Sequence, residues 1–217
     1  MASTAINPTR MELTRLKGRL KTAIRGHKLL KDKRDELMRR FWEIVFRNRE
    51  LRTRVEEGLT RANGAMAVAT AVMSPDFLEQ ALMCPKQSVQ LKIRLENLVG
   101  VNVPRYDVRT SVENESAIYP YGFAQTSGEL DTAIGALAEV FRDMLELAEI
   151  EKTMQLLAEE IEKTRRRVNA LEHVMIPELE TNIKYISMKL EENDRSTKIR
   201  LMKVKDMMIK QQQEAEL

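Results

Sequence analysis

The stretch LKGRLKTAIRGHKLLKDKRDELMRRFWEIVFRNREL, residues 16–51, places an apolar residue at every seventh position. The uncharged series extends beyond this stretch and consists of Leu16, Ala23, Leu30, Leu37, Ile44, Leu51, Gly58, Ala65 and Val72. A companion series three residues earlier is apolar except at His27, Arg34 and Asn48, which we expect to fix the register or the partner. This period predicts one long coiled-coil helix over residues 9–73.

A second seven-residue pattern predicts another long helix over residues 129–210. Its main series is Leu147, Met154, Ile161, Val168 and Met175, and its companion series is Ile150, Leu157, Thr164 and Leu171. Capping boxes are expected at both helix starts, with Thr9 and Thr126 as the capping residues. Pro177 lacks an amide hydrogen, so we expect a kink or a break near Met175 and Ile176.

The segment between the two helices, residues 74–128, changes periodicity. Ser74 and Pro75 can start a short helix that runs to about Met83. Apolar and polar residues then alternate on both sides of a turn at residues 97–100, which predicts a β-hairpin over about 88–108. Pro104 cannot donate a ladder hydrogen bond, so its strand should lie at an edge. The remaining residues to 128 are expected to form a loop.

The two predicted helices carry opposite charge. Residues 9–62 hold 17 Lys and Arg against 8 Asp and Glu, a net charge of +9, and residues 129–217 hold 14 against 19, a net charge of −5. Helices of similar length and opposite charge can pair if the chain folds back on itself. The sequence therefore predicts a mostly α fold: a long antiparallel two-helix coiled coil, left-handed because of its period, with the short helix and the hairpin at the end opposite the termini.

Residues able to perform chemistry are scarce. The sequence has no glycine-rich phosphate-binding loop, so we expect no nucleotide site and no catalysis. His27 and His173 lack cysteines or carboxylates at zinc-ligand spacing, and we interpret each as a seam or surface histidine. Cys84, the single cysteine, is expected to be a packed, inert thiol. No cofactor and no metal ion are expected.

The charge pattern leaves two other functions open. The basic first helix could neutralise nucleic-acid phosphates, although no aromatic platform or reading motif accompanies it. A generic coiled-coil scaffold or homodimer fits the same composition. No apolar run reaches the roughly 20 residues that cross a bilayer, and residues 1–9 do not resemble a signal peptide. We therefore expect no direct membrane insertion and a cytoplasmic location.

Three ordered motifs are more specific than the seven-residue period. NPTRMELTRLKGRLKTAIRGHKLLKDKRDEL at residues 7–37, EKTRRRVNALEHVMIPELE at residues 162–180 and YGFAQTSGELD at residues 121–131 resemble the D subunit of V-type and archaeal-type ATPases and ATP synthases, the central rotor stalk of these complexes. The predicted hairpin segment is similar to the same family, so the resemblance covers nearly the whole chain.

This resemblance implies a non-catalytic shaft that couples ATP hydrolysis or synthesis in a head to rotation of a membrane ring and to proton or sodium transport. The implied partners are a hexameric head of A and B subunits, the F subunit of the central stalk and a funnel-shaped subunit that joins the shaft to the ring, with no nucleic acid. The implied location is the cytoplasmic face of the membrane. Seam residues that would stiffen the shaft are Leu16, Leu30, Leu37, Ile44, Leu51, Leu147, Met154, Ile161 and Val168. Possible head contacts are Arg10, Arg15, Lys203 and Lys205.

Overall fold

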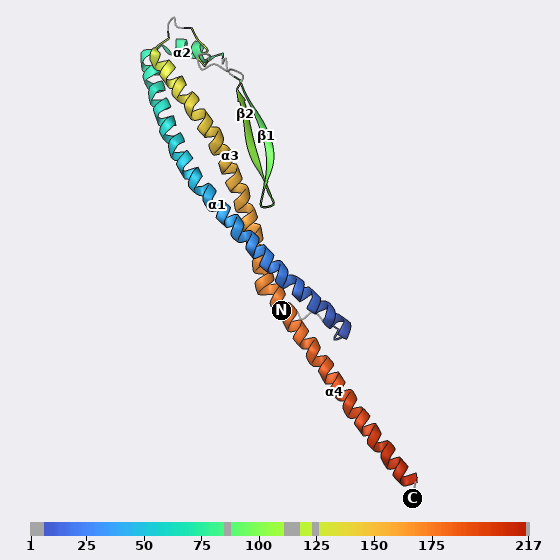
Figure 1. Ribbon diagram of the computed structural model, residues 1–217. Coiled ribbons are helices and arrows are strands. Elements are labelled where there is room, and N and C mark those ends of the chain that lie inside the picture. Colours follow the sequence, from blue (N-terminus) through green and yellow to red (C-terminus); the bar gives the residue numbers. More distant parts are fainter. Residues whose placement is uncertain (1–6, 85–87, 111–117, 123–125, 216–217) are drawn as a thin grey trace. The chain divides into compact units, whose positions relative to one another are not determined.

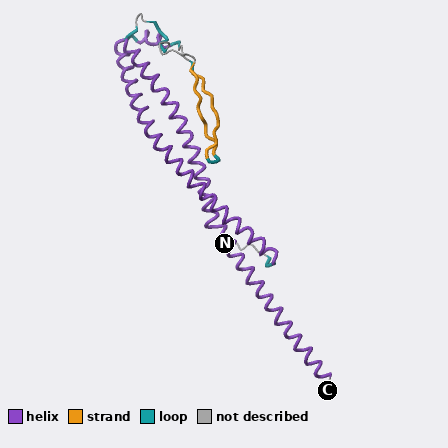
Figure 2. The backbone as a smooth tube through the Cα atoms, viewed as in Figure 1, coloured by secondary structure: helices purple, strands orange, loops and turns teal. Residues whose placement is uncertain are grey.

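The computed structural model describes residues 7–84, 88–110, 118–122 and 126–215. It is mostly helical, with one two-stranded antiparallel sheet, as the sequence predicts (Figures 1 and 2). The elements in chain order are α1 (Arg10–Val72), α2 (Pro75–Leu82), β1 (Val89–Leu98), β2 (Val101–Thr110), α3 (Gly128–Ala170), a π-helical segment (Leu171–Met175) and α4 (Ile176–Ala215). The chain divides into two compact units, Met1–Arg34 with Lys163–Leu217, and Asp35–Glu162.

One of the two predicted helix caps is confirmed. The Glu12 amide donates to Thr9 Oγ1 at 3.2 Å directly before α1. The cap at the start of α3 was assigned to the wrong residue: the Glu129 amide donates to Ser127 Oγ at 3.1 Å, whereas the Thr126 hydroxyl donates to the Gly122 carbonyl. Because α3 begins at Gly128, Ser127 occupies the capping position and Thr126 lies one residue too early.

In the first unit the beginning of α1 pairs with α4 in antiparallel orientation. Leu16, Leu179 and Ile186 form its buried core. Arg10 donates to both carboxylate oxygens of Asp194 at 3.1 Å, and His27 Nε2 lies 3.3 Å from Glu172 Oε2. As residue numbers rise along α1, those of the partners fall. The basic helix therefore pairs with acidic side chains of the other helix, as their opposite charges predict.

A single π-helical turn lies directly before Pro177, where the sequence predicts a kink or a break. Proline has no amide hydrogen to donate, and its ring crowds the carbonyl four residues earlier. The chain accommodates this with the segment Leu171–Met175, where the Ile176 amide bonds to the Leu171 carbonyl, five residues back instead of four. The helix is widened rather than broken, and α4 follows without a gap.

In the second unit the rest of α1 pairs with α3. Ala69, Met73 and Leu130 form one buried cluster, against which Leu78 of α2 packs. The buried stripe drifts along α1, since Val72, the last member of the predicted apolar series, is 67% exposed. An α-helix repeats every 3.6 residues, so a strict seven-residue series moves out of the interface over many turns.

The hairpin closes with a two-residue turn at Val99 and Gly100, inside the predicted turn segment. Both residues have positive φ, 53° and 82° respectively. This turn twists in the sense that antiparallel strands favour, but a β-branched residue in the left-handed region is strained. The Asn97 side chain supports the turn by accepting the Gly100 amide at 2.9 Å. Val99 also packs against a buried cluster, which holds it in place.

The turn end of the hairpin packs against the paired helices. Val101 and Val103 share a buried cluster with Leu37 of α1 and Leu157 of α3. Further along β2, Glu149 of α3 binds the strand twice. Its Oε2 accepts the backbone amide of Tyr106 at 2.8 Å, and its Oε1 accepts Arg105 at 2.7 Å. The helices thus hold the hairpin by both apolar and charged contacts.

Gly58 provides a test of the helix pairing in the second unit. A Cβ atom at this position would lie 2.2 Å from Val140 Cγ2, whereas a Cβ at Gly64 would have no heavy atom within 4 Å. Gly58→Ala should lower the free energy of unfolding by about 1 kcal/mol, because overpacking outweighs the gain in helix propensity. Gly64→Ala should raise it by about 1 kcal/mol. Urea unfolding followed by circular dichroism measures both changes.

Glu149 provides a test of how the hairpin is held. Glu149→Ala leaves the Tyr106 amide and the Arg105 guanidinium without this acceptor, and a hydrogen bond to a charged group contributes roughly 1.5–3 kcal/mol. We expect β2 amides to exchange with deuterium about tenfold faster or more, while the helices keep their protection. Glu151→Ala, at an exposed position on the same helix, is the matched control. Equal exchange in both variants would contradict the assignment.

Candidate functional site

The nine residues predicted to form the seam lie in the interior of their units. Leu16, Leu37, Leu51 and Val168 are buried, and Leu30, Ile44, Leu147, Met154 and Ile161 are half-buried. In α3 the companion series is the more buried one, since Ile150, Leu157 and Thr164 are 7% exposed or less. The stiffening role of the seam remains a proposal, but its members are placed where such a role requires them.

The seams also contain polar groups. Asn48 Nδ2 and Thr164 Oγ1 are buried and have no hydrogen-bond partner. A buried group of this kind costs roughly 1–3 kcal/mol. Such a cost is tolerated in coiled coils where a polar residue excludes alternative registers. Asn48 was expected to have this function, and Thr164 adds a second position in the other unit.

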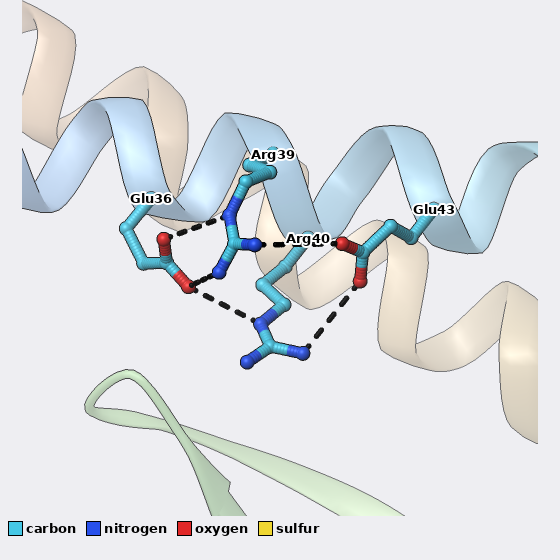
Figure 3. A network of polar contacts seen from close by, with 4 residues as sticks. All are labelled: Glu36, Arg39, Arg40 and Glu43. Carbon is cyan, nitrogen blue, oxygen red and sulfur yellow. Dashed lines mark hydrogen bonds and ion pairs between the residues drawn. The ribbon is translucent and has the colours of Figure 1, made fainter.

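A four-residue ionic network lies on the surface of α1 (Figure 3). Glu36 accepts Arg39 at 2.7 Å and Arg40 at 3.2 Å, and both arginines reach Glu43. The hydrogen bond from Arg39 lowers the pKa of Glu36. All four side chains are well exposed, so the network stabilises the helix only slightly. It is a solvated face and not a catalytic pair.

The loop before α3 is joined to that helix by a tyrosine. The Tyr121 hydroxyl donates to Asp131 Oδ1 at 2.6 Å, and its ring packs beside Leu130 and Ala69. Burial, with a smaller effect from Asp131, raises the pKa of Tyr121. The hydroxyl is therefore a neutral donor at physiological pH, which suits a structural contact.

A group of apolar side chains without a partner among the described residues lies on α4 beyond Asp194. Seven side chains there are between 42% and 68% exposed: Ile199, Leu201, Met202, Val204, Met207, Met208 and Ile209. Arg10, which binds Asp194, is the first residue of α1, so α4 continues past the last pairing that α1 makes in its unit. Contiguous apolar surface of this kind marks an interaction site.

Two smaller apolar surfaces lie in the second unit. Trp42 and Phe46 are 53% and 65% exposed on α1, with ring centroids 6.5 Å apart. On β1 an apolar row, Val89, Leu91, Ile93 and Leu95, is between 39% and 72% exposed. Aromatic and apolar side chains exposed together favour protein partners.

The four predicted head contacts fall into two groups. Arg10 pairs with Asp194, and Arg15 lies 3.5 Å from Glu12, so both arginines have partners within the chain. Lys203 and Lys205 are exposed on the same part of α4 as the apolar side chains. The structure brings these two lysines, and not the arginines, together with a candidate interaction surface.

Within the described parts of the chain, no three His, Cys, Asp or Glu side chains are grouped so that they could hold a metal ion. The described helices include none that is long and apolar enough to cross a membrane. His27 is half-buried and His173 is exposed, as predicted. The prediction for Cys84 was wrong: its thiol is exposed after α2 and is not packed. Helix α2 ends at Leu82, so Cys84 lies beyond the packed helical face.

Sequence reasoning missed the surfaces that remain uncovered. The apolar pattern of α4 predicts a buried stripe as far as Met208, but in this chain α1 has no residue left to cover it. The signal for an overhang is the number of helical residues on each side of the turn region: 63 in α1, against 43, 5 and 40 in α3, the π-helical segment and α4. The alternation in β1 likewise predicts one buried face, and gave no indication that this face is exposed.

Comparison with known proteins agrees with the motifs. The family model for the D subunit of ATP synthase matches residues 12–206. The D subunit of the V-type ATP synthase of Acetivibrio thermocellus is 62% identical over 211 residues, 97% of this chain and 95% of the relative. The corresponding proteins of Clostridioides difficile and Clostridium novyi are 59% and 55% identical, over 97% and 98% of this chain and 94% and 99% of theirs. The chain therefore belongs to the family of ATP synthase D subunits, whose members are non-catalytic central-stalk components of V-type ATPases and ATP synthases.

Proposed function

We propose that this chain is the rotating shaft that couples ATP hydrolysis or synthesis in a head of A and B subunits to rotation of a membrane ring and to proton or sodium transport. Family membership supports a role in such a complex. The observation that carries this proposal is the apolar overhang of α4, which no described residue of the chain covers.

The overhang fits insertion into a protein bore. Burying a Leu, Ile, Val or Met side chain is favourable by roughly 1.5–3 kcal/mol. Apolar residues occur around most of the helix between Ile199 and Ile209, and one flat partner would leave some of them in water. A sleeve that surrounds the helix covers all of them. Lys203 and Lys205 can place their charged ends at polar groups of the sleeve while their stems pack along it.

A pair of packed helices suits torque transmission. Two helices with interlocked side chains resist twisting better than one, because turning either helix requires its neighbour's packed side chains to move. A single asymmetric shaft inside a threefold head also touches three equivalent subunit pairs differently. Each nucleotide site then differs in affinity from its neighbours, and that difference couples rotation to catalysis.

The proposed partners follow from the same role. The F subunit binds the side of the shaft, and a funnel-shaped protein connects it to the membrane ring. The shaft lies at the cytoplasmic face without entering the bilayer. Nucleic acid is a poorer candidate, since Arg10 and Arg47 of the basic helix pair with Asp194 and Glu146 of the acidic one.

A homodimer is the second candidate function, because a second copy could cover the α4 overhang. Light scattering after gel filtration separates the two proposals. The purified chain is mixed with the A and B head proteins, with and without the F subunit. One copy per head hexamer, with altered ATPase turnover, is the result expected for a shaft. A stable homodimer that ignores the head would favour the scaffold.

The overhang itself can be tested by substitution. Leu201→Gln combined with Val204→Gln should weaken association with the head by about a hundredfold or more, since two apolar burials of roughly 1.5 kcal/mol each are lost. The fold should be unchanged because both positions are already exposed. The matched control is Leu29→Gln with Val174→Gln, at 69% and 60% exposure within the paired region. Titration of labelled chain with the head measures both, and equal affinities would refute the insertion.

A further inference from the structure

The hairpin is oriented with its mixed, charged face toward the helices. Val101, Val103 and Arg105 lie on one face of β2, and all three contact α1 or α3 side chains. Residues on β1 alternate between the two faces. The opposite face carries the apolar row of β1, which rises to 72% exposure at Leu95. A hairpin that only covered the helices would turn its apolar face inward, so this orientation indicates a second partner.

The two edges of the hairpin are not equivalent. On β2, the outward-facing amide of Tyr106 is occupied by Glu149, and Pro104 has no amide to offer. Figure 1 shows β2 on the side of α3 and β1 on the far side. Every described residue of β1 from Val89 to Asn97 is exposed. One edge is therefore closed by the chain itself, and the other is open.

The register identifies which groups of β1 are open. Tyr106 is paired with Ile93, and its amide points away from β1, so this is a non-hydrogen-bonded pair. Such pairs alternate, and they include Leu91 with Val108 and Leu95 with Pro104. The missing amide of Pro104 therefore costs the hairpin nothing. Leu91, Ile93 and Leu95 turn their backbone groups outward, and the same residues carry the exposed apolar side chains.

We propose that the open edge of β1 receives a β-strand from a partner protein, which extends the hairpin into a three-stranded intermolecular sheet. Strand addition satisfies the outward backbone groups and gives the apolar row a neighbouring row to pack against. A lone hairpin is marginally stable, and a third strand strengthens it. The incoming strand is apolar at alternate positions.

The charged residues of β1 indicate which side chains the incoming strand should carry on its other face. Lys92 and Arg94 of β1 lie between the apolar residues and point to the opposite face. Arg94 already pairs with Asp107 of β2 and lies directly opposite Arg105. In an antiparallel sheet of two copies of β1 centred on Ile93, Lys92 of one copy would add a third cation beside Arg94 of the other, and like charges directly opposite are destabilising. The strand is therefore assigned to a different protein, which carries an acidic residue where it meets Lys92.

The partner must also turn with the shaft, and this step rests on the proposed function. A strand ladder is a fixed, multiply bonded contact that a stationary protein would break at every step of rotation. The head is therefore excluded. Of the two proposed partners that turn with the shaft, the F subunit is the one that binds its side, and the hairpin lies beside α3 (Figure 1), so the strand is assigned to the F subunit.

Proline substitution at matched positions tests the assignment. Leu91 and Val108 face each other in one non-hydrogen-bonded pair, so proline at either removes an outward amide and no ladder bond. The purified F subunit is titrated against the immobilised full-length chain. Leu91→Pro should weaken binding at least tenfold, and Val108→Pro should stay within about twofold of the unchanged chain. Leu91→Thr, which keeps the amide, should weaken binding less than Leu91→Pro.

Each other result counts against the proposal. Equal losses for Leu91→Pro and Val108→Pro, or for Leu91→Pro and Leu91→Thr, would show that the hairpin face and not the open edge binds the partner. Normal binding by Leu91→Pro would overturn strand addition while leaving the shaft proposal intact. No binding of the F subunit to the unchanged chain would overturn both the strand assignment and the proposed stalk partnership.

Discussion

The rest of the structure depends on burial of a narrow apolar stripe between antiparallel helices. Charged residues make up 32% of the chain, and the stripe is the part of α1 that is buried against α3 or α4. Cross-helix ion pairs such as Arg47 with Glu146 add selectivity at the margins of the stripe. Small residues adjust the spacing, as at Gly58, where Val140 fills the space that a side chain would take.

A seam one or two side chains wide also limits the kind of function. Such a core buries leucines and valines but encloses little volume in which a substrate could be desolvated. The Glu36 and Arg39 network lies on an exposed helix face, and Asn48 Nδ2 is a single buried atom. The part-buried carboxylates Glu149 and Asp131 hold the hairpin and the loop before α3. These features agree with the non-catalytic role of the family, and we propose that the chain acts through its surface and its stiffness.

The surfaces that matter for assembly are those where internal pairing stops. Beyond Asp194, α4 has no described partner and exposes apolar side chains around the helix. On the hairpin, Glu149 closes the inner edge and leaves the outer edge open. Both sites arise in the same way. The helix or strand is fully formed, but no described element of the chain packs against its exposed apolar side chains. We propose that partner proteins cover both surfaces.

The sequence by itself determined the long helices, the Pro177 perturbation, the short helix and the hairpin with its turn. These follow from local chemistry: the period of apolar residues, the missing proline amide and the alternation along a strand. Only the tertiary structure decided that Val72 is exposed, that Ser127 caps α3, that Glu149 binds β2 and that the apolar face of β1 points outward. Periodicity specifies which side of an element is apolar. It does not specify whether the chain has another element long enough, and close enough, to cover that side.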